Sequence, residues 1–427
     1  MRPRVKVLIT GVDGYSGWPL ALHLLKRGHE VVGIDNFVTR QRVAEVGSWS
    51  ATPILDMHER RRALEEHGIK GFRFYEGDLC DYATVRHVLR QEKPDTIVHL
   101  GEQRSAPYSM IDVHHAVATQ CQNVTSTLHI VYAMKDECPK SHLVKMGTMG
   151  EYGTPNIDIA EGFFEVEFRG RKDRVPFPRQ ASSWYHWSKV FDTGDVMLAN
   201  KLWGLPTTDV MQGVIYGTRT PEISEDWQLT RFDFDEVWGT ALNRFCVQAV
   251  LGLPLTPYGK GGQRRGFIAL EDSMQSLRLA VENPAAQGEY RVFNQFDESY
   301  SVGDLAKLVV KVAGKLQMKA EIHNSYNPRV ELEEHYYNPL HDNLLKLGYR
   351  HQRTLEEALE WMLSDLQRFR SRLEEKKAVV QPRMDFRAGD NRTRLHIEKT
   401  ARGPVASNAG ARKAPSPAAG SASFSER

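Results

Sequence analysis

The feature that most constrains the fold of this chain is a set of closely spaced glycines near its N-terminus, Gly11-Val-Asp-Gly14-Tyr-Ser-Gly17. Residues 6–10 before them form a short apolar run, which predicts a buried strand, and residues 19–27 after them have the apolar spacing of a helix. A plain tight turn would explain the glycines alone. Between a strand and a helix, however, they also let the backbone approach a pyrophosphate at the helix N-terminus.

The following segments repeat this strand–helix pattern. Apolar runs predict strands at residues 29–35, 71–77, 95–100 and 142–146, with helices at 83–91 and 117–134. The alternation is typical of an α/β protein with a doubly wound parallel sheet, the Rossmann arrangement. We therefore predict a dinucleotide-binding domain over residues 1–213. The pattern is irregular after residue 214, so residues 214–377 are predicted to be mainly a smaller substrate-binding lobe that shares some elements with the first domain. An amphipathic helix at 355–377 is the last ordered element expected.

Residues 378–427 differ in composition from the rest of the chain. They are rich in Ala, Ser, Gly and Pro, they hold nine Lys/Arg against four Asp/Glu, and their apolar residues are sparse and aperiodic. Such a segment buries too little apolar surface to offset the entropy of ordering it. We predict a disordered basic tail without a nucleic-acid partner. The alternative is a basic arm that contacts a nucleic acid or an acidic surface.

Composition argues against several other classes of protein. No run of 18 apolar residues is present, so no membrane insertion is expected. The apolar strand at residues 6–10 leaves no room for a signal peptide before it. The cysteines at positions 80, 121, 138 and 246 lack a CxxC spacing, so we expect neither a metal site nor a disulfide framework. Free thiols fit a reducing compartment, and a cytoplasmic protein is expected.

Acidic residues at strand ends indicate which dinucleotide is bound. Asp35 ends the second predicted strand, where a carboxylate accepts from the ribose hydroxyls of NAD and repels the 2′-phosphate of NADP; Arg40 nearby is a signal for NADP. Asp78 follows the third strand and is placed to meet the adenine. We assign cofactor binding to Gly11, Gly14, Tyr15, Ser16, Gly17, Asp35, Asn36, Arg40, Asp78, Leu79, Leu100, Asn123, Tyr185 and Lys189.

A second motif, Tyr185-His-Trp-Ser-Lys189, is suited to catalysis. Positions i and i+4 lie on one helix face, and a lysine ammonium there lowers the pKa of the phenol. The tyrosinate can then take a hydroxyl proton while a hydride leaves for nicotinamide. An ordinary amphipathic helix would show the same spacing. Thr148 follows the strand predicted from residue 142, and its hydroxyl could hydrogen-bond the same substrate oxygen.

These motifs occur in the order found in the extended short-chain dehydrogenase/reductase superfamily, which the chain resembles from about residue 5 to 350. Within it, the strings at residues 99–112, 147–158, 239–248, 258–263, 327–331 and 334–338 resemble the UDP-sulfoquinovose synthase family. The resemblance implies a tightly held NAD, UDP-glucose as substrate and sulfite as nucleophile. C4 oxidation, C5/C6 dehydration, sulfite addition and C4 re-reduction would give UDP-sulfoquinovose, the head-group donor of a sulfolipid or a sulfonated glycan. We also expect a homodimer.

One departure from the wider superfamily bears on the chemistry. Related sugar-nucleotide dehydratases carry an Asp-Glu pair directly after the threonine, whereas this chain has Met149 and Gly150. Acid/base work must then come from elsewhere. His186, which titrates near neutral pH, is the first candidate, and Glu151 is the second. The alternative for His186 is a packed histidine, because the residue after Tyr185 points ~100° away on a helix.

The resemblance also implies the residues that face the nucleotide-sugar, namely Arg104, Thr148, Gln212, Asn243, Gln263, Arg265 and Arg329. Arginine forks suit phosphate oxygens, although each arginine could be an ordinary surface charge, and Gln212 departs from the asparagine common in epimerases. The alternatives to the synthase are an NDP-sugar 4-epimerase, a 4,6-dehydratase, and a non-catalytic NAD-binding regulator. A regulator would be expected to have lost Tyr185 or Lys189.

Overall fold

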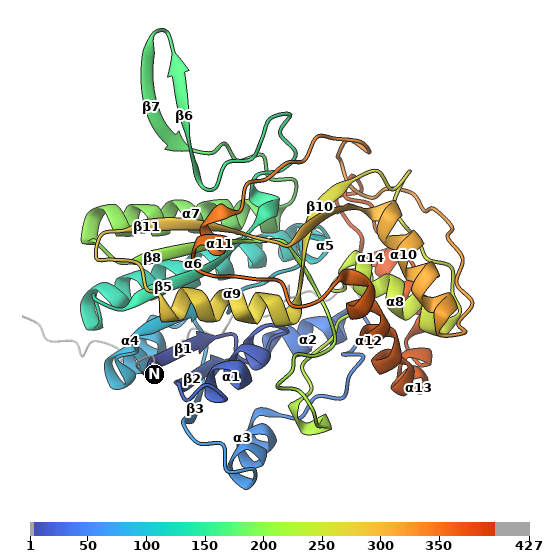
Figure 1. Ribbon diagram of the computed structural model, residues 1–427, viewed down its shortest axis with the longest axis horizontal. Helices are drawn as coiled ribbons and strands as arrows, with labels where there is room; N and C mark the ends of the chain where they lie inside the picture. Colours follow the sequence, from blue (N-terminus) through green and yellow to red (C-terminus); the bar gives the residue numbers. More distant parts are fainter. Residues whose placement is uncertain (1–3, 398–427) are drawn as a thin grey trace, which may run out of the picture.

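The computed structural model describes residues 4–397, and over these residues it has the predicted α/β architecture (Figure 1). Seven strands of this part of the chain form one sheet in the order β11-β8-β5-β4-β1-β2-β3, and all their pairings are parallel. The strands are β1 (Lys6–Thr10), β2 (Glu30–Asp35), β3 (Phe72–Glu76), β4 (Thr96–His99), β5 (His142–Thr148), β8 (Thr207–Gln212) and β11 (Tyr290–Gln295). Because the strands are parallel, their carboxyl ends meet along one edge, which is where ligands of such sheets bind.

The sheet is buried on both faces. Successive side chains of a strand point to opposite sides, so Val7 and Ile9 of β1 join one apolar core and Leu8 joins another. The Leu8 side is covered by α4 (Tyr82–Glu92), α6 (Val113–Glu137) and α7 (Trp184–Trp203). The opposite side is covered by α1 (Gly17–Leu25) and α9 (Leu270–Glu282) (Figure 1). The near-continuous apolar character of these strands therefore reflects their two covered faces.

The second half of the chain supplies both the smaller lobe and part of the main sheet. Strand β11 joins the main sheet beside β8, so the two halves share elements. The predicted boundary at residue 213 falls between β8 and β9. The lobe contains β9 (Val214–Tyr216), β10 (Arg264–Ala269), β12 (Glu298–Ser301), α8 (Ala241–Leu251), α10 (Val302–Lys315) and α12 (Leu355–Arg368). The division into two domains stays a prediction.

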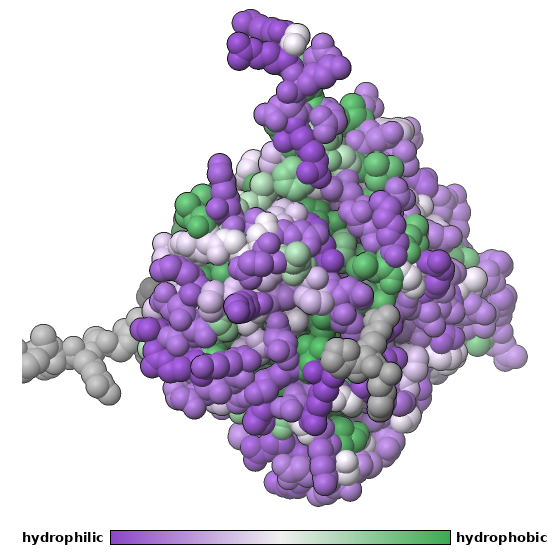
Figure 2. All heavy atoms as spheres, turned by 60° about the vertical axis from the view of Figure 1, so that its left-hand side comes forward, coloured by the Kyte–Doolittle hydropathy of each residue, from purple (hydrophilic) through white to green (hydrophobic). Residues whose placement is uncertain are grey.

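Several elements were not predicted from the sequence. They include α2 (Val38–Glu45), α3 (Met57–Glu66), α5 (Ala106–Ser109) and α11 (Asp342–Lys346). A hairpin of β6 (Phe163–Phe168) and β7 (Arg171–Pro176) projects from the body, and Figure 2 shows it as largely hydrophilic. Over residues 4–397, no helix is both long and apolar enough to cross a membrane.

The prediction for the C-terminal part is wrong in two respects. The expected helix at 355–377 breaks at Phe369 into α12 and α13 (Arg370–Glu374), and the turn η3 (Lys377–Val380) follows. Residues 378–397 were predicted to be disordered, yet they are packed on the body. Met384, Phe386 and Leu395 are buried against α2, α5 and the loop before α8. These apolar side chains join one cluster from a largely irregular stretch of chain, so the packing needs no periodic pattern. Residues 398–427 of the predicted tail lie outside the described residues.

Candidate active site

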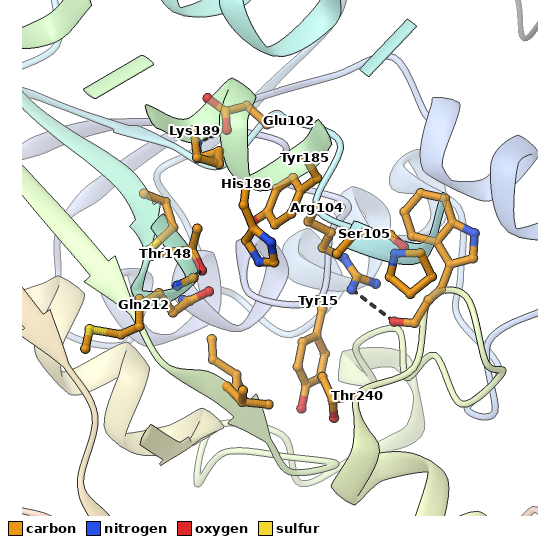
Figure 3. A pocket seen from close by; sticks show the side chains of 18 of the residues that line it. Tyr15, Glu102, Arg104, Ser105, Thr148, Tyr185, His186, Lys189, Gln212 and Thr240 are labelled. Carbon is orange, nitrogen blue, oxygen red and sulfur yellow. Dashed lines mark hydrogen bonds and ion pairs between the residues drawn. The ribbon is translucent and has the colours of Figure 1, made fainter. Parts of the chain in front are cut away.

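One elongated cavity of about 600 Å³ follows the carboxyl edge of the main sheet (Figure 3). Six of the seven strands of the main sheet, all except β11, contribute a lining residue at or just after their carboxyl end. These residues are Gly11 after β1, Asp35 on β2, Asp78 after β3, Leu100 after β4, Thr148 on β5 and Gln212 on β8. The strand ends predicted from the sequence thus lie along a single cavity.

Most of the predicted site residues line this cavity. They are Gly11, Gly14, Tyr15, Ser16, Gly17, Asp35, Asn36, Asp78, Leu79, Leu100, Arg104, Thr148, Tyr185, His186, Lys189, Gln212, Gln263, Arg265 and Arg329. Arg40, Asn123 and Asn243 are not among the lining residues. We describe the cavity as three parts: a cofactor end at the glycine turn, a catalytic centre at Tyr185, and a nucleotide end at Arg265.

The glycine turn at the cofactor end is packed too closely for side chains. Gly11 has φ +73°, and a Cβ at Gly17 would lie 2.2 Å from the carbonyl oxygen of Gly11. Ser16 is the N-cap of α1 but makes no side-chain capping bond, and the first turn holds no acidic residue. Gly17 begins α1 and lines the cavity, so the positive end of the helix dipole faces the cavity and fits the pyrophosphate of NAD.

Asp35 is held beside this turn by two backbone donors. Its carboxylate accepts from the N–H groups of Asp13 (2.9 Å) and Phe37 (2.8 Å), and burial raises its pKa to about 6. Arg40, predicted as a cofactor contact, instead donates two 2.7 Å hydrogen bonds to Asp13. Its guanidinium is thus engaged outside the cavity, which removes the signal for NADP. The remaining wall, with Asp35, fits the ribose of NAD.

Two further predicted contacts are buried beneath the cavity wall. Asn123 donates to the carbonyl of Gln103 and to Ser188 Oγ, both at 2.9 Å, and accepts from Gln103 N–H at 2.8 Å. It supports the loop after β4 and does not reach the cavity. Asn243 is buried on α8, where its backbone N–H is capped by Thr240. Asn243 itself therefore lies behind the cavity wall, whereas Gly239, Thr240 and Ala241 of the same sequence string line the cavity.

The catalytic centre combines the end of β5 with the first turn of α7. Figure 3 shows Thr148, Tyr185 and His186 around the same space. Ser183 caps α7 by accepting from the N–H of His186, and the N–H of Tyr185 donates to Ser109 Oγ at 3.0 Å. Burial raises the pKa of Tyr185, while a hydrogen bond with Thr148 acts in the opposite direction. The expected lowering of this pKa by Lys189 is therefore not what the structure shows.

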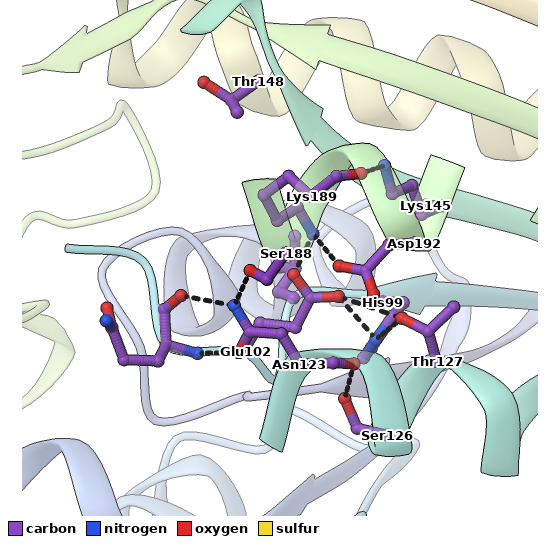
Figure 4. Close-up of polar contacts among 12 residues, drawn as sticks. His99, Glu102, Asn123, Ser126, Thr127, Lys145, Thr148, Ser188, Lys189 and Asp192 are labelled. Carbon is purple, nitrogen blue, oxygen red and sulfur yellow. Dashed lines mark hydrogen bonds and ion pairs between the residues drawn. The ribbon is translucent and has the colours of Figure 1, made fainter. Parts of the chain in front are cut away.

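Lys189 does not lower this pKa as expected because its charge is shared with acidic partners, one of which, Glu102, was not predicted from the sequence (Figure 4). The ammonium of Lys189 forms an ion pair with Glu102, and its Nζ lies 3.4 Å from Asp192 Oδ2. The same Glu102 carboxylate also lies 3.0 Å from His99 Nε2. Two carboxylates thus compensate the lysine charge, which leaves less of it for the phenol. In the sequence, Glu102 could have been found as an acidic residue shortly after the apolar strand predicted at residues 95–100.

His186 occupies the space that the missing acid pair leaves open. A Cβ placed on Gly150 would lie 2.4 Å from both Cδ2 and Nε2 of the imidazole, so only glycine leaves room for the ring. The His186 and Tyr185 ring centroids are 4.9 Å apart, and Ser183 Oγ lies 2.9 Å from Nδ1. Burial lowers the pKa of His186 to about 3, so its expected titration near neutral pH is wrong for the free protein. The imidazole is neutral at pH 7 and able to accept a proton.

Glu151, the second candidate, points away from the cavity. It is fully buried, and its carboxylate accepts from Thr193 Oγ1 at 3.0 Å and lies 3.5 Å from Lys145 Nζ. Burial raises its pKa to about 7. Its place beneath β5 makes it a support for the catalytic centre: it also accepts from the N–H of Thr148.

The nucleotide end gathers positive charge. Arg265 forms an ion pair with Glu331, and its Nη1 lies 2.8 Å from His335 Nε2. Burial lowers the pKa of Arg329, and the nearby guanidinium groups of Arg265 and Arg244 lower it further while Glu331 opposes them. Three guanidinium groups this close fit an anionic group with several oxygens, such as a diphosphate.

Further residues of the cavity, among them Gln212 beside Thr148 at the end of β8, were either predicted or missed. Gln212 Nε2 is buried without a hydrogen-bond partner among the described residues, so it is free to bind a ligand. Arg104 forms an ion pair with Asp233 and also lines the cavity. Arg244, Met384 and Phe386 line it as well but were not predicted. No sequence signal marked the last two, because they lie in a segment read as disordered.

Comparisons with known proteins agree with this geometry. A model of the NAD dependent epimerase/dehydratase family matches residues 7–295. The chain belongs to that family and is an NAD-dependent enzyme. The chain is 52% identical over 384 residues to UDP-sulfoquinovose synthase of Sulfolobus acidocaldarius, which covers 90% of this chain and 98% of the relative. It is 48% identical over 377 residues to the chloroplastic UDP-sulfoquinovose synthase of Spinacia oleracea, covering 88% of this chain and 78% of the relative.

Solved structures show the same fold. UDP-glucose 4-epimerase of Thermotoga maritima matches with a TM-score of 0.64 at 17% identity, over 85% of this chain and 99% of that one. UDP-glucuronic acid 4-epimerase of Bacillus cereus matches with a TM-score of 0.64 at 21% identity and the same coverage. The doubly wound parallel sheet predicted from the sequence is thereby confirmed.

Proposed function

We propose that this chain is a UDP-sulfoquinovose synthase, which converts UDP-glucose and sulfite into UDP-sulfoquinovose. The observation that carries the proposal is the imidazole of His186 over Gly150, where family dehydratases would place an acid. The strong identity to two UDP-sulfoquinovose synthases supports it. The catalytic centre thus has the tyrosine–lysine pair for C4 oxidation but a different group for the steps at C5 and C6.

Each part of the cavity has a task in this reaction. The glycine turn and Asp35 would hold NAD, which would supply reversible hydride transfer at C4. Arg265 and Arg329 bind the diphosphate of the substrate, and Gln212 offers its free amide to the same molecule. We expect the glucose to lie between Thr148 and Tyr185 in this arrangement.

Tyr185 and Thr148 act on the C4 hydroxyl. The tyrosinate form of Tyr185 takes the O4 proton as C4 is oxidised, and the Thr148 hydroxyl hydrogen-bonds the same oxygen. The raised pKa of Tyr185 then keeps this proton on the phenol while the 4-ketone exists. A phenol that donates to the ketone makes the C5 proton more acidic, which prepares the next step.

His186 acts on C5 and C6. Its neutral imidazole takes the C5 proton, and the imidazolium then gives that proton to the C6 hydroxyl, which leaves as water and gives an enone. The sulfur of sulfite then forms a bond to C6, a proton returns to C5, and the C4 hydride is restored. The diphosphate offsets the Arg329 and Arg265 charges that hold the pKa of His186 down, so substrate binding makes it a stronger base. Met149 and Gly150 leave this space uncharged, which suits the sulfite anion.

The experiment that tests the proposal is incubation of the purified protein with UDP-glucose and sulfite, followed by the mass of the product. A synthase gives a product heavier than UDP-glucose by the mass of SO₂. A 4-epimerase would give an isomer of unchanged mass, and a 4,6-dehydratase a product lighter by water without any sulfite. A non-catalytic NAD-binding regulator would give no product. Each rival therefore has its own outcome, and any of the three would contradict the proposal.

The predicted homodimer is supported by an exposed apolar face on α6 and α7. Its side chains are Val113, Val117, Leu128, Tyr132, Trp184, Trp187, Phe191, Leu198 and Leu202. The two helices lie side by side, and a patch of this kind is covered by a partner in most soluble proteins. Sedimentation should give a dimer, and Phe191→Asp should give a monomer. Phe168→Asp, at a more exposed position on the hairpin, should leave the dimer intact. A monomeric wild type would contradict the proposal.

A cytosolic location is part of the same proposal. It rests on the free thiols of the chain, in which described cysteines such as Cys138 and Cys246 are buried and unpaired. The spinach relative is described as chloroplastic, so the compartment needs its own test. Fractionation of the source cells should recover the protein with cytosolic markers, and recovery with an organelle or membrane fraction would contradict this part.

A further inference from the structure

We infer that the C-terminal residues 381–397, called here the strap, form a wall of the nucleotide-sugar site, with Phe386 as a positioning residue for Arg329. The inference deepens the proposed function and rests on it, since it assigns the nucleotide end of the cavity to a UDP-sugar. The family model ends at residue 295, so the strap lies outside the part of the chain that the family shares. Met384 and Phe386 are the strap residues that line the cavity.

Backbone hydrogen bonds fix the strap along the cavity. The N–H of Phe386 donates to the carbonyl of Pro328 at 3.0 Å. The N–H groups of Arg383 (2.5 Å) and Met384 (3.0 Å) donate to the carboxylate of Glu236. Pro328 directly precedes Arg329, so this pairing attaches the strap to the segment that carries the substrate-facing arginine.

A second attachment joins the strap to the other half of the molecule. Asn391 is fully buried, and its N–H donates to the carbonyl of Ile111 at 2.7 Å while its Nδ2 donates to that of Met110 at 3.0 Å. Its Oδ1 accepts from the N–H of Asp385 at 2.9 Å. All the hydrogen-bonding groups of this asparagine are thus used to hold one path of the chain. The strap connects the segment after α5 in the NAD-binding half with residues 328–329 of the substrate lobe.

The contact that gives the strap a role in binding is between Phe386 and Arg329. The Arg329 guanidinium lies over the Phe386 ring, with its Cζ 5.5 Å from the ring centroid. Phe386 itself is only 8% exposed, so its ring is fixed by the packing around it. A guanidinium held over an aromatic face by the cation–π attraction keeps its N–H groups, which lie in the guanidinium plane, free to donate. Phe386 therefore orients Arg329 toward the diphosphate without using any of its donors.

The test compares point variants of the full, NAD-loaded protein by calorimetric binding of UDP. Phe386→Leu removes the aromatic face but keeps an apolar side chain, and it should weaken UDP binding about five- to tenfold. Phe386→Tyr keeps the ring and should stay within about twofold of the wild type. Val43→Ala is the matched control, since Val43 of α2 packs in the same apolar cluster but lies outside the strap and does not line the cavity. It should lower the melting temperature and leave UDP affinity unchanged.

Further readouts separate the possible failures. The NAD content of each variant should equal that of the wild type, because the strap is not at the cofactor end. Hydrogen exchange on the wild type needs no variant: UDP should slow exchange of the Met384 and Phe386 amides. UDP affinity equal to that of the wild type in Phe386→Leu, an equal loss of UDP affinity in Val43→Ala, or unchanged exchange would each overturn the inference. A wild type that binds UDP through the strap but forms no sulfonated product would instead contradict only the proposed reaction.

Discussion

The catalytic centre and the nucleotide end of the same cavity are built in different ways. Thr148, Tyr185 and Lys189 stand on β5 and α7, regular elements whose register fixes the side chains relative to one another. Arg329 and Phe386 come from an irregular segment and from the strap, which are joined by backbone pairing. Proton and hydride transfer need a fixed geometry, which regular elements provide best. Recognition of a large flexible substrate tolerates a wall assembled from distant segments.

The comparison implies that substitutions at the catalytic centre and at the nucleotide end affect different kinetic constants. At the catalytic centre they should lower kcat with little effect on substrate affinity. At the nucleotide end they should weaken affinity with little effect on the bound reaction.

The largest effect is expected from Tyr185→Phe. The phenol oxygen is needed only where the proton moves, so turnover should fall by about 10²–10⁴-fold or more. Affinity for UDP-glucose should stay within a few-fold of the wild type, because the ring is kept. Single-turnover rates and calorimetry measure the two quantities separately. A near-normal rate in Tyr185→Phe would contradict its role in proton transfer. Failure of this variant to bind UDP-glucose would mean that the catalytic centre and the nucleotide end do not act separately.

The next effect tests whether His186 needs the space over Gly150. Gly150→Ala places a Cβ where the imidazole now lies, which forces the ring away from C5. In deuterated water the wild type should incorporate deuterium at C5 of UDP-glucose, and this variant should lose most of that exchange. Reduced cofactor should still form, because C4 oxidation does not need His186.

Gly194→Ala is the matched control for this prediction. Gly194 lies on α7, the helix that carries His186, but an added Cβ there meets no atom within 4 Å. Its exchange and turnover should match those of the wild type. Wild-type C5 exchange in Gly150→Ala would contradict the role of His186, and a folded His186→Asn variant with full exchange would remove it from the mechanism.

How far the sequence could predict this molecule follows the same division. Strand ends and the i, i+4 pair of α7 are periodic features, so Asp35, Thr148 and Tyr185 could be placed correctly. The environment of each group could not be predicted, because it depends on residues distant in sequence. Glu102 compensates Lys189, and burial lowers the pKa of His186. The strap was missed for a related reason, since isolated apolar residues carry no periodic signal.

A smaller effect concerns the charge beside Lys189. Glu102→Gln removes a negative charge from the ammonium, which then favours the tyrosinate more strongly. The acidic limb of the kcat/KM profile should move to lower pH by about one unit. Glu331→Gln removes the carboxylate paired with Arg265 at the nucleotide end, and it should change KM without moving that limb. A kcat/KM–pH profile that is unchanged in Glu102→Gln, or that shifts equally in both variants, would contradict the separation of the catalytic centre from the nucleotide end.

The smallest effect is on stability in acid. The folded-state pKa of His186 is lowered from 6.5 to about 3, so the unfolded chain binds a proton in this window that the folded chain does not. The wild type therefore loses stability as the pH falls below about 6.5, by up to about 2 kcal/mol from this group between pH 7 and 5. His186→Asn should lose correspondingly less over that range. Urea unfolding at both pH values measures the difference, and equal losses would mean that the imidazole is solvated.

The central claim is that one centre oxidises C4 with Tyr185 and carries out the C5 and C6 steps with His186 in place of an acid pair. The most direct measurement is the mass and C5 isotope content of the product formed from UDP-glucose and sulfite in deuterated water. The account predicts a product heavier by SO₂ that carries a single deuterium at C5, with that product abolished in both Tyr185→Phe and His186→Asn. A sulfonated product without deuterium at C5, or one formed normally by His186→Asn, would contradict it.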